Sequence, residues 1–111
     1  MEPIWTENLN IAITVCNTKA DILYMNAKSK ATFAKYGEDL LNKSLYNCHG
    51  EASSEKIRQM LSDGSENIYT IEKAGVKKII VQMPWKQDEL IAGLVELSIE
   101  LPIDMPHFVR K

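Results

Sequence analysis

The sequence predicts an α+β fold in which a five-stranded antiparallel sheet is flanked by short helices. Its 111 residues suffice for one domain with a single core. Two β-like runs come first, helical segments fill the middle, and three β-like runs close the chain. Runs segregated in this way favour an antiparallel sheet over a doubly wound parallel one.

The first two strands are predicted over 11–17 and 21–25, joined by a turn at Asn17-Thr18-Lys19. A helix is predicted over 27–36. Asn26 precedes it and can accept hydrogen bonds from its first free amides, while Gly37 suits its C-terminal end. The hairpin therefore leads directly into a capped helix.

The middle of the chain carries two further helical segments. Residues 38–45 predict a short, irregular helix, and residues 54–63 a better one capped by Ser53 or Ser54. The second helix has a buried stripe and ends at Gly64. Its stripe consists of Ile57, Met60 and Leu61.

Three strands are then predicted over 66–73, 76–84 and 89–101. A loop from Trp85 to Asp88 would place Lys77 opposite Glu96, and the same register places Lys73 opposite Glu100. This register predicts a core face that holds Ile80, Gln82 and the odd-numbered residues of the last strand. The opposite face is predicted to carry Ile79, Val81, Met83, Leu90, Ala92 and Leu94.

That second face is too apolar to remain in water, so either the N-terminal segment with Trp5 or a second subunit is expected to cover it. A homodimer interface formed by Trp5 and the six residues of that face is the corresponding prediction. A Leu94→Glu substitution would then separate the subunits.

Composition excludes several classes of function. Thirteen basic and fifteen acidic residues leave a net charge of −2, which does not favour nucleic-acid binding. No apolar run approaches the roughly 20 residues that span a bilayer, and the start does not resemble a signal peptide. Cys16 and Cys48 are therefore expected to be reduced thiols of a cytoplasmic protein.

Catalytic and metal sites are not expected. His49 and His107 accompany no recognisable nucleophile motif, so we expect no enzyme activity. The two cysteines and two histidines match no zinc-binding spacing.

Three segments carry a resemblance to the PAS domain family: AITVCNTKADILYMN, GEDLLNKSLYNCH and ELIAGLVELSIEL. The first resembles the family's opening hairpin and ends at Asn26. The second resembles the segment that leads into the family's second helix, and the third resembles its final strand, with Gly93 at the usual glycine. Asn42 replaces the usual glycine of the second segment. The resemblance covers 9–101, which leaves 1–8 as an N-terminal cap segment and 102–111 as a tail. Pro102 and Pro106 disfavour a signalling helix in that tail.

The resemblance implies a sensory or regulatory module of signal transduction. It would bind a small molecule between the sheet and the helices and signal through a protein partner. The expected ligand-binding residues are Gln82 beside Gly93 inside the sheet, the hydroxyls of Tyr36 and Tyr69, and His49.

The cofactor stays open. Some members of the family bind haem, for which His49 or Cys48 would be the ligand. The family's flavin motif is not matched by Asn47-Cys48-His49-Gly50-Glu51. The alternative function is a module without a ligand, whose core is filled by Met25, Phe33, Met60 and Leu61. It would act in protein–protein interaction or dimerisation through the outer sheet face.

Overall fold

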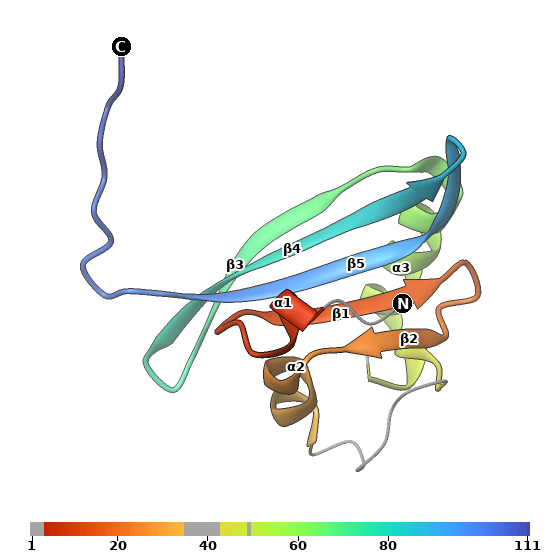
Figure 1. The fold of residues 1–111 in the computed structure, drawn as a ribbon, viewed down its shortest axis with the longest axis horizontal. Coiled ribbons are helices and arrows are strands. Elements are labelled where there is room, and N and C mark those ends of the chain that lie inside the picture. Colours follow the sequence, from red (N-terminus) through yellow and green to blue (C-terminus); the bar gives the residue numbers. More distant parts are fainter. Residues whose placement is uncertain (1–3, 35–42, 49) are drawn as a thin grey trace.

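The structure is a computed structural model that describes residues 4–34, 43–48 and 50–111. It confirms the α+β class: one five-stranded antiparallel sheet has the strand order β2-β1-β5-β4-β3, with helices on either side (Figure 1). The elements in chain order are α1 (Ile4–Glu7), β1 (Ala12–Asn17), β2 (Ile22–Met25), α2 (Ala27–Thr32), the 3₁₀ helix η2 (Leu45–Cys48), α3 (Glu51–Asp63), β3 (Asn67–Lys73), β4 (Val76–Gln87) and β5 (Leu90–Leu101).

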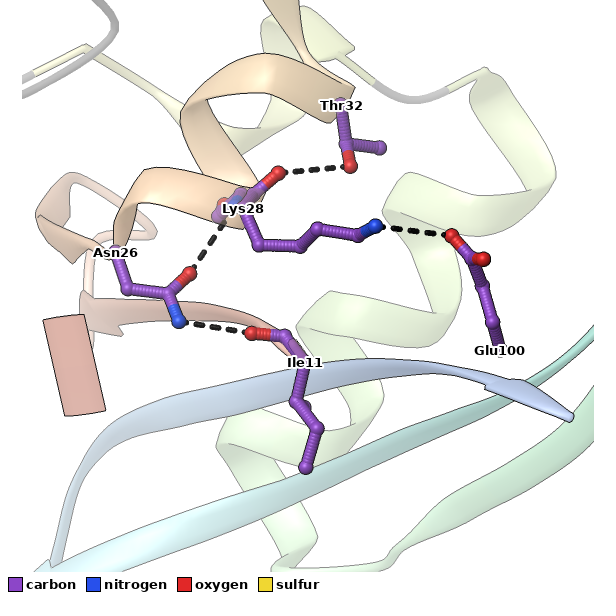
Figure 2. Close-up of polar contacts among 6 residues, drawn as sticks. Ile11, Asn26, Lys28, Thr32 and Glu100 are labelled. Atoms are coloured by element: carbon purple, nitrogen blue, oxygen red, sulfur yellow. Dashed lines mark hydrogen bonds and ion pairs between the residues drawn. The ribbon is translucent and has the colours of Figure 1, made fainter. Parts of the chain in front are cut away.

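Asn26 joins three parts of the fold. As predicted, it caps α2, and its side-chain oxygen accepts hydrogen bonds from the backbone N–H groups of Ser29 and Ile13. Its side-chain amide donates to the backbone oxygen of Ile11 (Figure 2) and to that of Thr6. One buried side chain thus connects α1, the start of β1 and α2. The predicted C-terminal end of this helix, at Gly37, lies outside the described residues.

Helix α3 starts earlier than expected. It begins at Glu51, so Ser53 and Ser54 lie inside the helix and do not cap it. Its N-cap is Gly50, which has no side chain to accept hydrogen bonds from the first helical amides. The predicted end is confirmed, because Gly64 adopts a left-handed conformation with φ 77° and donates its N–H to Met60. Ile57 and Met60 are buried against the sheet, and Leu61 packs partly against the same core.

The predicted register of the last hairpin is wrong. Strand β4 continues through Trp85 to Gln87, and the turn is two residues, Asp88 and Glu89, with φ of 52° and 68°. Lys77 consequently lies opposite Leu101, five residues beyond the expected Glu96, and Lys78 rather than Lys73 lies opposite Glu100. A shift by an odd number exchanges the two faces of a strand, because side chains alternate along it.

We call the sheet face toward α2 and α3 the inner face and the opposite one the outer face. The inner face includes Leu94 and Glu96 of β5, which are 1% and 8% exposed. Val95 and Leu97 therefore lie on the outer face, where β4 presents Met83 and Val81 opposite them. The buried apolar cluster lies between the inner face and the helices. Its members are Cys16, Ala20, Ile22, Met25, Leu45, Ile57, Met60 and Leu94.

Helix α1 lies on the other side of the sheet from α3 (Figure 1). The tail 102–111 leaves the end of β5 and extends away from the sheet, and its apolar side chains are exposed. No helix among the described residues is long and apolar enough to cross a membrane.

Candidate functional site

A cavity of about 180 Å³ lies on the inner face, between α2 and strands β1, β3, β4 and β5. Its walls combine apolar and polar side chains. They are Ala12, Thr14, Thr32, Phe33, Tyr69, Ile71, Lys78, Ile80, Glu96 and Ser98. We call this space the inner cavity.

A chain of three polar side chains runs from Glu96, which lines the inner cavity, to Gln82 and Asn67, which line a second cavity described below. Asn67 donates its side-chain amide to Gln82 Oε1 at 2.9 Å, and Gln82 Nε2 donates to Glu96 Oε2 at 2.6 Å. A carboxylate oxygen accepts hydrogen bonds, so Gln82 turns its amide nitrogen to Glu96. This leaves Gln82 Oε1 to accept from the amide of Asn67. Gln82 and Glu96 are both buried on the inner face, and buried polar groups are retained only with hydrogen-bond partners.

A second buried polar contact connects the floor to α2. The hydroxyls of Thr14, on β1, and Ser29, on α2, are hydrogen-bonded, and both residues are buried. The contact holds α2 over the cavity from one side. A displacement of Thr14 would therefore also displace α2 through Ser29.

Tyr69 separates the inner cavity from a second one of about 280 Å³, which reaches α3 and is lined by Ala52, Ser53, Lys56, Asn67, Tyr69 and Gln82. Burial raises the pKa of the Tyr69 phenol, and the negative charge of Glu96 raises it further. Tyr69 is therefore a neutral hydroxyl at physiological pH that can donate or accept.

One basic residue, Lys78, lines the inner cavity and lies near an ion pair. Lys28 of α2 forms an ion pair with Glu100 at 3.0 Å (Figure 2), and Lys78 lies opposite Glu100 in the β4–β5 register. The hydrogen bond and charge of Lys28, with a smaller contribution from Lys78, hold the pKa of the Glu100 carboxyl below its usual value. Lys78 and Glu96 are thus the charged residues that line the inner cavity.

Gln82 and Tyr69 are the expected ligand-binding residues that the structure brings to these cavities. Tyr36, His49 and the side chain of Cys48 lie outside the part of the chain that the structure describes. Sequence reasoning missed Glu96, Thr14 and Lys78. A charged residue within the apolar run of β5 was the available signal for Glu96, but only the correct register turns it inward.

Gly93 was expected beside Gln82, and this prediction is wrong. Gly93 lies opposite Trp85 and Asn17. A Cβ there would overlap the backbone oxygen of Cys16 and approach Trp85 Nε1 to 2.6 Å. The absent side chain lets the Trp85 indole N–H donate to Cys16 O at 3.0 Å. Gly93 therefore permits close contact between neighbouring strands.

The outer face carries a groove of about 650 Å³, which we call the outer groove. Its lining is mostly apolar and consists of Trp5, Thr6, Ile13, Val15, Leu23, Tyr24, Trp85, Val95 and Leu97. Trp5 is 75% exposed, so α1 forms a wall of the groove and does not cover it. Helix α1 is held there by Tyr24, whose hydroxyl contacts Thr6 Oγ1 at 2.9 Å and donates to Glu7 at 3.1 Å.

The structure places the residues of the expected dimer interface in different parts of the fold. Ile79, Val81 and Met83 share the outer face with the groove, next to Ile99, Leu97 and Val95. Leu94 is in the core, so its assignment to an interface is wrong and Leu94→Glu would disrupt folding instead. Leu90 is 73% exposed at the end of the hairpin, and Ala92 lies at the irregularity of the β4–β5 pairing.

Among the described residues, no group of three His, Cys, Asp or Glu side chains is placed to hold a metal ion. Cys16 is a free, buried thiol, and burial raises its pKa to about 11. A thiol that stays protonated is a poor nucleophile and a poor metal ligand. The inner cavity itself offers the charges of Glu96 and Lys78 and the hydroxyls of Thr14, Ser98 and Tyr69, which can recognise a ligand by charge and hydrogen bonds.

No family model matches the sequence, and no curated protein matches it either. Solved structures do match. A sensory box sensor histidine kinase from Vibrio cholerae has a TM-score of 0.68 and 14% identity, over 89% of this chain and 88% of that one. The Aer2 receptor of Vibrio cholerae, described as a dual PAS–haem oxygen sensor, has a TM-score of 0.60 and 9% identity, over 83% and 95% of the two chains.

The sensor region of a sensor histidine kinase matches with a TM-score of 0.62 and 11% identity, over 80% of this chain. The chain spans only 38% of that protein's length. At such identities the likeness concerns the fold. The chain therefore has the PAS-like α+β fold, with a five-stranded antiparallel sheet and short helices.

Proposed function

We propose that this chain is a sensory or regulatory module of signal transduction that binds a small molecule in the inner cavity. The observation that carries the proposal is the hydrogen-bonded chain Asn67–Gln82–Glu96, which ends at the buried carboxylate of Glu96 in the wall of the inner cavity. A core that served only for packing has no need of a buried carboxylate, because burying a charge costs free energy. Oriented polar groups in a largely apolar cavity are the usual arrangement for binding a small ligand.

The size of the cavity limits the ligand. An apolar cavity of about 150 Å³ is known to hold benzene, so 180 Å³ suits a molecule slightly larger than one aromatic ring. A haem is far larger, and we do not propose one here. The solved structures of similar fold support the sensory role, because their descriptions name sensor proteins.

The signal would pass through the sheet. Thr14 and Glu96 point into the inner cavity, and their neighbours Ile13, Val15, Val95 and Leu97 line the outer groove. Because successive residues of a strand point to opposite faces, a ligand that displaces β1 or β5 also moves the groove. A partner bound at the outer face would register that movement. We place the module in the cytoplasm, where the free thiol of Cys16 stays reduced.

Binding is tested by screening a small-molecule library against ¹⁵N-labelled protein. The side-chain amide signals of Asn67 and Gln82 are expected to shift with a true ligand. Ser98→Leu, which fills the cavity, should abolish the shift, whereas Thr70→Leu, an exposed residue of β3, should not. A library without any compound that shifts these amides would refute the proposal.

The outer groove favours a second candidate, a dimerisation module that needs no ligand. Exposed Trp5 and the apolar groove lining form a surface that a second copy would remove from water. The solution mass should then be that of a dimer and fall to that of a monomer in Trp5→Glu. The control Ile103→Glu, in the exposed tail, should stay dimeric. A monomeric wild-type protein would exclude this candidate.

A further inference from the structure

We infer that a second copy of this chain pairs with the edge of β3 that faces away from β4, so that two five-stranded sheets join into one of ten strands. The pairing is antiparallel and centred on Thr70, which lies opposite Thr70 of the second copy. The inference goes beyond the proposed function, because it concerns the edge of the sheet and needs neither a ligand in the inner cavity nor contact at the outer groove.

The two edges of the sheet differ. At the β2 edge, residues 43–45 lie alongside the strand. The N–H of Ile22 donates to the backbone oxygen of Lys43 at 2.8 Å, and a β-bridge joins Asp21 to Ser44. At the opposite edge, β4 is the one strand among the described residues that pairs with β3 (Figure 1). The described part of the chain therefore covers one edge of the sheet and leaves the other open.

The β3–β4 register shows which backbone groups the open edge presents. A two-residue turn at 74–75, with φ angles of 52° and 79°, joins the strands. The residues that flank such a turn, here Lys73 and Val76, form a hydrogen-bonded pair, and hydrogen-bonded and non-hydrogen-bonded pairs then alternate along the strands. Three residues of β3 consequently direct their N–H and C=O groups away from β4. They are Ile68, Thr70 and Glu72.

Strand β3 lacks the features that usually protect an open edge. Proteins protect such edges with a proline, a bulge, charged side chains or a very short strand. Strand β3 has seven residues without proline, pairs regularly with β4, and has its single lysine at its last position. It also exposes apolar side chains, because Ile68 is 54%, Tyr69 40% and Ile71 41% exposed. An edge of this kind is a template for another strand.

The order of residues in β3 makes the edge complementary to itself. A pairing centred on Thr70 places Ile68 opposite Glu72 of the second copy, so that all three outward-directed residues bond, through about six backbone hydrogen bonds. A pairing shifted in either direction leaves part of this set without a partner. A pairing centred on Glu72 would also place two carboxylates opposite each other, which is unfavourable.

The side chains between these backbone pairs also match. Tyr69 lies opposite Ile71 of the second copy in a non-hydrogen-bonded pair, where side chains approach most closely. Pairs of an aromatic and a β-branched residue stabilise a sheet at such positions. Tyr69 and Ile71 both line the inner cavity, so the second copy adds its own Ile71 beside the cavity wall.

The joined sheet leaves room for the helices. Helix α3 packs on β4 and β5. Three strand spacings, about 14 Å, therefore separate the α3 helices of the two copies, which exceeds a helix diameter of about 10 Å. Because one pair of strands buries little area, we expect a weak dimer with a dissociation constant on the order of 100 µM.

Sedimentation equilibrium between about 10 µM and about 1 mM protein tests the association. The average mass of the wild type should rise toward that of a dimer. Thr70→Pro removes an N–H that points away from β4, so the fold should persist while the dissociation constant rises about tenfold or more. The matched control Thr70→Ala keeps this N–H and should stay dimeric, as should Trp5→Glu in the outer groove. Circular dichroism checks that each variant is folded.

Two results would overturn the inference. One is a wild-type protein that stays monomeric at about 1 mM. The other is a dimer that persists in folded Thr70→Pro but is lost in Trp5→Glu, which would place the contact at the outer groove.

Cross-linking tests the register and does not depend on the folding of Thr70→Pro. Thr70 is the one β3 residue that meets its own copy, with Cα atoms about 5.5 Å apart, a distance that a disulfide spans. In a Cys48→Ser background, where Cys16 is buried, Thr70→Cys should form a disulfide-linked dimer under mild oxidation. The two copies of Glu72→Cys would lie four residues apart, about 13 Å, and should not cross-link. Equal cross-linking of both variants would contradict a pairing centred on Thr70.

Discussion

Replacement of Asn26 by alanine should be among the most destabilising single changes in this chain. The fully buried side chain makes four hydrogen bonds, accepting from the backbone N–H groups of Ser29 and Ile13 and donating to the oxygens of Thr6 and Ile11. Loss of an N-cap costs about 1 kcal/mol. Each of the other three groups loses a partner inside the protein at about 1 kcal/mol or more.

The expected loss in the free energy of unfolding is therefore about 4 kcal/mol, against a total of about 5–15 kcal/mol for a typical domain. Urea unfolding followed by circular dichroism measures it. Asn10→Ala, at an exposed position, is the matched control and should change stability by less than about 0.5 kcal/mol.

The variant Asn26→Asp distinguishes the hydrogen bonds that this side chain accepts from those that it donates. It keeps both accepted hydrogen bonds but points an oxygen at the carbonyls of Thr6 and Ile11, so it should destabilise at least as much as alanine. A loss below about 1.5 kcal/mol for Asn26→Ala, or a stable Asn26→Asp, would refute the view that this side chain holds α1, β1 and α2 together.

Two further predictions concern β1 and β5. Gly93→Ala should destabilise the domain by about 3 kcal/mol, because its Cβ overlaps Cys16 O and breaks the Trp85 hydrogen bond. In the same urea titration, the control Gly50→Ala adds a Cβ that has no atom within 4 Å, and it should cost at most about 1 kcal/mol, because alanine is a poorer N-cap than glycine. Cys16, whose pKa burial raises to about 11, is protonated in the folded state at pH values where an unfolded thiol has ionised. Its contribution to stability is thus complete below about pH 9 and falls as the pH rises toward 11, so the stability difference between wild type and Cys16→Ala should shrink by at most about 2 kcal/mol over this range. A pH-independent difference would contradict this assignment.

Local patterns predicted much of the fold. Alternating apolar residues located the strands within a few positions, and the residues at helix ends identified Asn26 as an N-cap and Gly64 as a C-terminal stop. These signals act between neighbours in sequence, so they can be read without knowledge of the rest of the chain. Gln82 was also placed correctly on the inner face.

The register of the last hairpin could not be predicted in this way. The turn at Asp88 and Glu89 requires positive φ at two residues that are not glycine, and no local signal marks it. The wrong turn length reversed the predicted faces of β5. Val95 was therefore expected to point inward in place of Leu94, and Glu96 was not expected on the inner face.

By itself, the sequence determined the class of fold, the order of its elements, the capping of α2 and an apolar sheet face in need of cover. Only the tertiary structure decided which β5 residues point inward. It therefore decided that Glu96 accepts a hydrogen bond from Gln82 on the inner face, and that Gly93 leaves room for Trp85 to donate to Cys16. The physical reason is that strand pairing joins residues distant in sequence, and its free energy depends on contacts across the whole sheet.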